Sequence, residues 1–167
     1  MIKMFGHELL KLIALSMMPA FEARAAIAYA VLFLNMNNIP LFIVLTAVSA
    51  TTGIIVYYSL NLFEKWVRRN GSFLRRILRR MYEKYIDYLR NKTSKYVEKY
   101  GLLGLTMFIM IPFPGSGVWT GALVANMFNV RPRDTVFAII IGAYMSSIIS
   151  WFLSNLGVLA FSYFPIL

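Results

Sequence analysis

The sequence predicts an all-α integral membrane protein made of two inverted hairpin-plus-span repeats with re-entrant helical hairpins, joined by a basic cytoplasmic amphipathic helical segment. Three observations predict this class for a single membrane domain over residues 1–167. The chain is 59% hydrophobic, with a mean hydropathy of +0.65, whereas roughly half of a soluble domain is apolar. Residues 25–63, 101–130 and 135–167 contain no Asp, Glu, Lys or Arg, and each window exceeds the ~20 apolar residues that cross a bilayer. Two proline-interrupted apolar segments each precede an uninterrupted one.

The first predicted re-entrant hairpin covers residues 1–38, and its apolar segment is interrupted by Pro19, Glu22 and Arg24. On one straight helix, the two charged residues would point to nearly opposite sides. One of them would then tend to face lipid, at a cost of about +2.5 to +3.5 kcal/mol near the bilayer centre. Pro19 disfavours helix at the residue before it and donates no backbone amide. We therefore expect the chain to reverse near Pro19, so that both charges face one interior cavity.

An uninterrupted transmembrane span is expected at residues 40–63, and cytoplasmic amphipathic helices at residues 64–100. Residues 64–99 hold 12 of the 17 basic residues and four of the seven acids. Because this charge lies between membrane segments, the positive-inside rule accounts for it better than nucleic-acid binding does. The expected partners are membrane lipids, with anionic lipid headgroups at the basic segment 64–99.

The second re-entrant hairpin is expected at residues 101–130, and the second span at residues 132–160. Its interruption, IPFPGSG, has two prolines and two glycines and cannot continue a regular helix. The turns LNMNNIP and ANMFNVRP follow the two interruptions in the same order, which indicates a duplicated half. Two hairpins and two spans would place Arg131 and Arg133 inside, as the positive-inside rule prefers, although Lys3 and Lys11 then fall outside.

The stretch PFPGSGVWTG is the most specific motif. Its glycines and serine could present backbone amides as an anion nest at the positive end of the following helix, with phosphate as a suitable guest. Alternatively, the glycines only permit a tight reversal, and Trp119 only packs or anchors at the interface. Gly117 and Gly121 form a GxxxG pair, which favours helix crossing or a homodimer. The candidate substrate- or ion-binding residues are Glu22, Arg24, Pro19, Pro112, Pro114, Gly115, Ser116, Gly117 and Trp119.

Several function classes find no support in the residues. The chain has no cysteine, which excludes disulfides, thiol catalysis and Cys-based metal sites. His7 beside Glu8 could not build a metal site alone. Paired carboxylates, a Ser/His/Asp set and a Walker loop are missing from the sequence, so we expect no enzyme, no metal and no cofactor.

The two motifs SMMPAFEARAAI and FIMIPFPGSGVWTGALVA resemble the small multidrug export family of prokaryotic membrane proteins. That family is in turn distantly similar to the DedA, or VTT-domain, superfamily. The resemblance implies two re-entrant hairpins, a prokaryotic plasma-membrane location and an embedded acid, which Glu22 matches. DedA proteins carry arginines within and after the second motif, whereas this chain has none there, which leaves Arg24 as the embedded positive charge.

Three functions remain open at this point. The first is a small DedA-like transporter or flippase that moves an amphipathic molecule with an anionic head, such as a polyprenyl-phosphate or a phospholipid, with proton coupling through Glu22. The second is a small multidrug exporter. The third is a structural membrane protein in which Glu22 and Arg24 are only a buried packing device.

Overall fold

A computed structural model describes residues 2–68, 101–113 and 115–163, and within these ranges the secondary structure is helical. The expected all-α class is confirmed for this part of the chain. The predicted basic segment 64–100 begins within the last residues of the third helix, and the rest of it lies outside the described residues. The helices are α1 (Ile2–Met17), α2 (Glu22–Leu34), α3 (Ile39–Arg68), α5 (Leu102–Met110), α6 (Val118–Met127) and α7 (Pro132–Tyr163).

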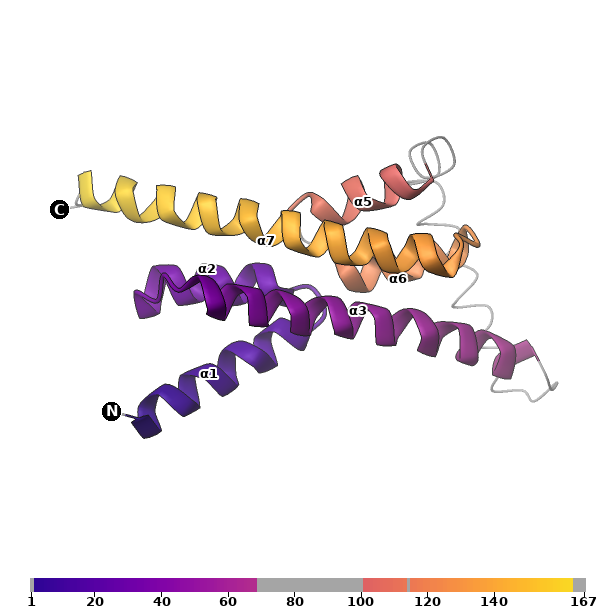
Figure 1. Cartoon of the computed structure of the whole chain (residues 1–167), viewed down its shortest axis with the longest axis horizontal. Coiled ribbons are helices and arrows are strands. Elements are labelled where there is room, and N and C mark those ends of the chain that lie inside the picture. Colours follow the sequence, from indigo (N-terminus) through magenta and orange to yellow (C-terminus); the bar gives the residue numbers. More distant parts are fainter. Residues whose placement is uncertain (1, 69–100, 114, 164–167) are drawn as a thin grey trace.

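The same order of helices, two short and one long, occurs twice along the chain. The long helices α3 and α7 lie along the length of the molecule and run in opposite directions (Figure 1). The pair α1 and α2 covers one half of this axis, and the pair α5 and α6 covers the other. Each pair reverses direction at its turn, and both turns lie near the middle of the molecule (Figure 1).

The two reversals lie at the predicted interruptions. Helix α1 ends at Met17, two residues before Pro19, and α2 begins at Glu22. Helix α5 ends at Met110, and Ile111 is extended, with φ −67° and ψ 120°. This conformation is the one that the residue before a proline prefers. The prolines therefore stop both helices where the sequence predicts that they should.

The turns that lead into the long helices share a conformation. Asn35 has φ 51° and Asn129 has φ 50°, and both values lie in the left-handed region that asparagine tolerates better than most residues. Asn35 ends α2, and Asn129 follows the last residues of α6. The prediction of a turn is confirmed for Asn35 and Asn129, but it is wrong for Asn126 of the second predicted turn, which lies in α6.

The side chain of Ile109 on α5 packs against both α6 and α7. Its side chain is 1% exposed and fills the space beside two glycines, because a Cβ on Gly121 of α6 or on Gly142 of α7 would collide with it. Gly121 of the predicted GxxxG pair therefore serves packing within the chain. Its partner Gly117 faces a different neighbour, described below. Close helix approach at small residues is the usual way that membrane helices associate.

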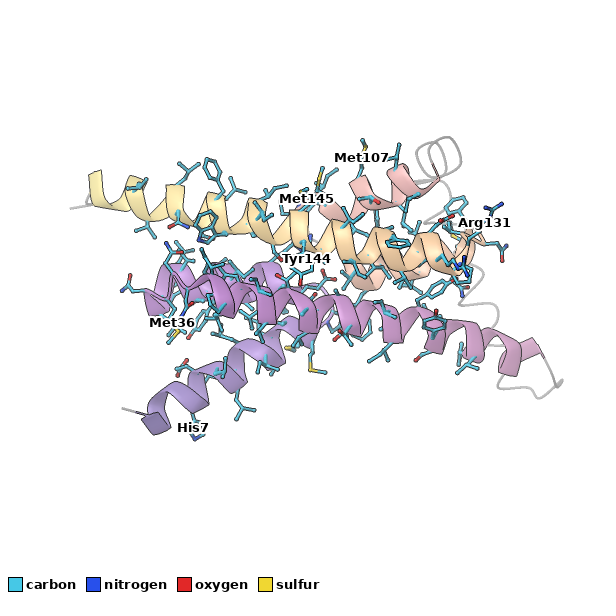
Figure 2. All side chains as sticks on the ribbon, in the orientation of Figure 1. His7, Met36, Met107, Arg131, Tyr144 and Met145 are labelled. Carbon is cyan, nitrogen blue, oxygen red and sulfur yellow. The ribbon has the colours of Figure 1, made fainter. Side chains whose placement is uncertain are left out.

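The long helices bury several small polar side chains and expose large apolar ones, beside a core that is otherwise apolar. Figure 2 shows Met107 and Met145 pointing outward, while Tyr144 lies toward α3. Segments Ile39–Leu60 and Pro132–Leu159 are long and apolar enough to cross a bilayer. The buried polar residues of α3 and α7 are Thr46, Ser49, Thr135, Ser146, Ser147, Ser150 and Ser154.

Replacing Ile109 should test the packing of the second helix pair. We expect Ile109→Ala to lower the free energy of unfolding by about 2–5 kcal/mol, because it leaves a cavity between two glycines that cannot fill it. Ile141→Ala on α7 is the matched control, since Ile141 is 45% exposed and its replacement should change stability by less than about 0.5 kcal/mol. Thermal unfolding in detergent measures both variants, and equal losses would contradict this account of the packing.

Candidate functional site

Glu22 and Arg24 form a buried ion pair at the start of α2. Arg24 Nη2 lies 3.0 Å from Glu22 Oε2, and the two side chains are 10% and 5% exposed. The backbone explains how residues two positions apart can pair. Glu22 has φ 56° and Ala20 has φ 74°, so Glu22 stands outside the regular helical register. The chain thus turns both charges toward one interior point, as the sequence predicts.

The guanidinium of Arg24 also donates hydrogen bonds to the second interruption, which is the turn between α5 and α6. Its Nη1 donates to the carbonyl oxygen of Ile111 at 3.1 Å and to that of Phe113 at 3.3 Å. These carbonyls follow the end of α5, and they also accept the backbone N–H groups of Phe113 and Ser116. Arg24 adds a further donor to each, because its planar fork can bind several acceptors at once. The first turn is thereby bound to the second across 87 and 89 positions of sequence.

The carboxylate of Glu22 caps α6. Its Oε1 accepts a hydrogen bond from the backbone N–H of Trp119 at 3.3 Å. Gly117, the residue before α6, makes no side-chain cap hydrogen bond, so the first turn of α6 has a free N–H group to offer. A carboxylate at this end is favoured by the helix dipole. The carboxylate of Glu22 thus lies at the N-terminus of α6, whereas the N–H of Ser116 in the predicted nest donates to the carbonyl oxygen of Phe113 at 3.1 Å.

Gly117 permits this close approach. A Cβ at position 117 would collide with both carboxylate oxygens of Glu22 and with Nη2 of Arg24. Gly115 meets a different need, since its φ of 89° is a left-handed conformation and the space around it is open. The two glycines that the sequence analysis groups together therefore have separate physical roles.

The remaining predicted site residues have different roles, and among them only Trp119 has a recorded hydrogen bond to the pair in the described ranges. Ser116 is buried, and its hydroxyl lies 2.6 Å from the carbonyl oxygen of Ile111 and 2.8 Å from that of Phe113, so it stabilises the turn. Pro19 and Pro112 are exposed and act by interrupting helices. Pro114 lies outside the described residues. Trp119 joins the site through its backbone, and its buried indole N–H has no partner within the described ranges.

Three serines at the pair were missed by the sequence analysis. Ser49 of α3 and Ser146 and Ser147 of α7 line a cavity of about 10 Å³ together with Glu22 and Arg24. A signal for them exists in the sequence. Ser146 lies in a series of small polar residues four positions apart in an otherwise apolar span, which places them on one face of the helix.

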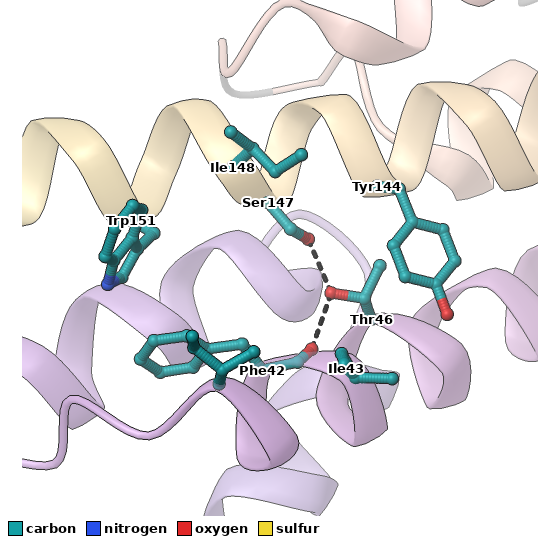
Figure 3. A pocket seen from close by; sticks show the side chains of 8 residues that line it. Phe42, Ile43, Thr46, Tyr144, Ser147, Ile148 and Trp151 are labelled. Carbon is teal, nitrogen blue, oxygen red and sulfur yellow. Dashed lines mark hydrogen bonds between the residues drawn. The ribbon is translucent and has the colours of Figure 1, made fainter.

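A larger apolar pocket of about 300 Å³ lies beside these serines, between α3 and α7. Figure 3 shows Ser147 and Thr46 joined across the two helices at its wall, with aromatic rings to either side. Thr46 Oγ1 lies 2.8 Å from Ser147 Oγ and 2.7 Å from the carbonyl oxygen of Phe42. The lining residues are Ile39, Phe42, Ile43, Thr46, Tyr144, Ser147, Ile148 and Trp151.

The described ranges contain no group of three His, Asp or Glu side chains that could hold a metal ion. His7 is exposed on α1 (Figure 2).

Fold and site together define a class of protein: a helical membrane protein in which two interrupted helices meet at a buried ion pair. The profile of the family described as "Putative small multi-drug export protein" matches residues 22–149, which include Glu22, Arg24 and the whole second motif. The chain belongs to this family, and the resemblance seen in the two motifs is confirmed. No curated protein and no solved structure matches the chain.

Removing one charge of the pair should lower the free energy of unfolding more than removing both charges does. We expect Arg24→Met to lower the free energy of unfolding by about 3–5 kcal/mol, because it leaves a buried carboxylate without its counter-ion. The double variant Glu22→Leu, Arg24→Met should recover most of that loss, since no buried charge remains. Chemical or thermal unfolding of the single and double variants in detergent measures the difference, and a double variant less stable than Arg24→Met would contradict it.

The collision at position 117 should depend on the charged side chains. We expect Gly117→Ala to lower the free energy of unfolding by about 1–3 kcal/mol through overpacking, and to cost less in the double variant, where smaller apolar groups face it. Gly157→Ala on α7 is the control, because its Cβ would lie at an ordinary 3.6 Å from Leu32 Cδ2. A Gly117→Ala cost that is equal in both backgrounds would show that the ion pair is not what requires glycine.

Proposed function

We propose that this chain is a multi-pass transporter of the prokaryotic plasma membrane that exports amphipathic compounds with an apolar, ring-containing body. The observation that carries the proposal is the buried pair of Glu22 and Arg24 where two interrupted helices meet, next to an apolar pocket. Ionisable residues inside a membrane are expensive, and they mark substrate or ion pathways by default.

The short helices support a re-entrant arrangement. At ~1.5 Å per residue, helices α1, α2, α5 and α6, with 16, 13, 9 and 10 residues, are all shorter than the ~30 Å hydrocarbon core. Each pair can enter the membrane part of the way and return, which would make residues 1–38 and 101–130 the two re-entrant hairpins. Their turns would then meet near the midplane, where non-helical backbone is tolerated only inside protein or against water.

The repeated order of helices supports an inverted repeat. Two short helices and a long one occur twice, the long helices run in opposite directions (Figure 1), and both connecting turns contain a left-handed asparagine. Inverted halves with discontinuous helices around a midplane site are typical of secondary transporters. We include in this proposal a distant relationship between this chain and the DedA superfamily.

The substrate class follows from the pocket between α3 and α7. Its volume of about 300 Å³ is at the lower end of the range of small-molecule sites. Phe42, Tyr144 and Trp151 offer ring surfaces, and no charged side chain lines it. Ile39, Ile43 and Ile148 are more than half exposed, so a compound dissolved in the bilayer could reach the pocket sideways.

A second candidate is a flippase for lipids with an anionic head, such as a polyprenyl-phosphate or a phospholipid. The hydrogen bonds of Glu22 favour it: the carboxylate holds Arg24 and the N–H of Trp119, and protonation of Glu22 would release both donors to a phosphate.

We also propose proton coupling through Glu22 and contacts of segment 64–99 with anionic headgroups. We further propose that the chain forms a homodimer and that it has no catalytic or nucleic-acid role.

Transport can be measured with two probes in liposomes that contain the purified chain. We expect efflux of ethidium, a ring-containing amphipathic cation, and a decrease of about tenfold or more in Glu22→Gln, as for the loss of an interaction worth about 1.4 kcal/mol. Ile148→Trp, which fills the pocket, should also slow efflux. Ile141→Trp is its control, since it lies on the same helix and does not line the pocket.

A fluorescent phosphatidylglycerol in the same vesicles separates the candidates. Movement of the lipid but not of ethidium would favour the flippase. Movement of neither probe would overturn transport for both classes and leave a structural role for the ion pair.

A further inference from the structure

The hydroxyl of Ser146 is an exception among the buried hydroxyls of this chain. Four of the others donate to the carbonyl four residues earlier, namely Ser16, Thr46, Thr135 and Ser154. Ser146 is 2% exposed, and its Oγ has no hydrogen-bond partner among the residues that the structure describes. A buried polar group without a partner costs about 1–3 kcal/mol, so a partner outside the protein is expected.

The cavity that Ser146 lines is suited to one water molecule. Its volume of about 10 Å³ is close to the ~10–15 Å³ that a single buried water occupies on this measure. Such a water needs two to four polar partners. The walls offer the carboxylate of Glu22 as an acceptor and the hydroxyls of Ser146 and Ser49 as donors or acceptors.

Ser147 connects this cavity to the apolar pocket, because it lines both of them. Its hydroxyl is oriented by Thr46. A carbonyl oxygen can only accept, so the proton of Thr46 is directed at Phe42, and Ser147 donates to Thr46 across the 2.8 Å contact (Figure 3). The lone pairs of Ser147 Oγ are then free to accept a hydrogen bond from a water in the cavity.

We propose that the cavity binds one water molecule between the Ser146 hydroxyl and the Glu22 carboxylate, and that this water and Ser147 form the route by which protons reach Glu22 from the apolar pocket. This inference rests on the proposed transport function, and it names the path that would link the substrate pocket to the ion pair.

The surroundings of Glu22 leave few other routes. Arg24 is the charged side chain at the site, and α5, α6 and α7 contribute Ile109, Val118 and Ala143 as apolar walls. Helix α6 adds only the backbone N–H of Trp119, and α3 adds Ser49. Apolar walls carry no protons, so the hydroxyls and the water form the polar path from the pocket.

The proton transfer balances along this path. A hydronium ion that enters the pocket gives one proton to Ser147 Oγ and becomes water. The Ser147 hydroxyl turns from Thr46 toward the cavity and releases its own proton to the cavity water. The water passes one of its protons to Glu22. The carboxylate becomes a neutral acid, the hydronium ion has become water, and the serine and the cavity water are regenerated when the Ser147 hydroxyl turns back to Thr46.

Infrared difference spectroscopy of the full chain after a rapid drop in pH tests this route without any substrate. The C=O stretch of protonated Glu22 is assigned by its loss in Glu22→Gln, and its rate of appearance is measured. We expect Ser146→Ala and Ser147→Ala to slow that rate by about tenfold or more, equivalent to about 1.4 kcal/mol in a barrier. Ser146→Ala should also remove the O–H band of a bound water.

Ser154→Ala is the matched control, because Ser154 is buried on the same helix and donates to the carbonyl of Ser150. Should Ser146→Ala fail to fold, Ser146→Cys keeps the volume with a weaker donor and should give an intermediate rate. Unchanged rates in both serine variants, or no carboxylic-acid band at any pH that the folded chain tolerates, would overturn the inference.

The liposome assay keeps the two proposals separate. Transport by the native chain together with unchanged protonation rates would refute the water route alone. Slowed protonation in a chain that moves neither probe would support the route and refute the transport function.

Discussion

The contact between Glu22 and Arg24 is the interaction on which the rest of this structure depends. It joins a carboxylate and a guanidinium from one turn to two carbonyls and a helix N-terminus from the other. The backbone groups at the second interruption need hydrogen-bond partners where they are buried. The pair supplies some of these partners, and the two breaks give the pair a protein-lined place to lie.

This arrangement has a cost in free energy, which arises from the backbone conformation at two residues. Glu22 and Ala20 both have left-handed backbone conformations, and each costs energy in a residue other than glycine. The surrounding contacts must hold these residues in place, because a regular helix through positions 20–24 would separate the charges. Strain of this kind persists where several contacts fix the same residue, as the two partners of Glu22 do here.

Much of the fold could be predicted from local features of the sequence. The prolines at 19 and 112 and the uncharged windows locate the breaks and the long helices, because helix termination and hydrophobic length are local properties. The charge spacing in EAR also indicates that the helix must break. What could not be predicted is which groups meet across the chain. The carbonyls of Ile111 and Phe113 carry no side-chain signature, and the role of Gly117 depends on an approach by residues more than 90 positions earlier.

The proposed substrate classes make different demands on the ion pair. A phosphate group and the Glu22 carboxylate would need the same donors, the guanidinium of Arg24 and the N–H of Trp119. While Glu22 is ionised, it holds these donors at no cost in translational entropy, whereas an incoming anion must pay that cost on binding. An anionic substrate could compete only after Glu22 gained a proton. A substrate held in the apolar pocket would not compete with Glu22 at all, so the charge state of one carboxyl group would decide which class of molecule this site can accept.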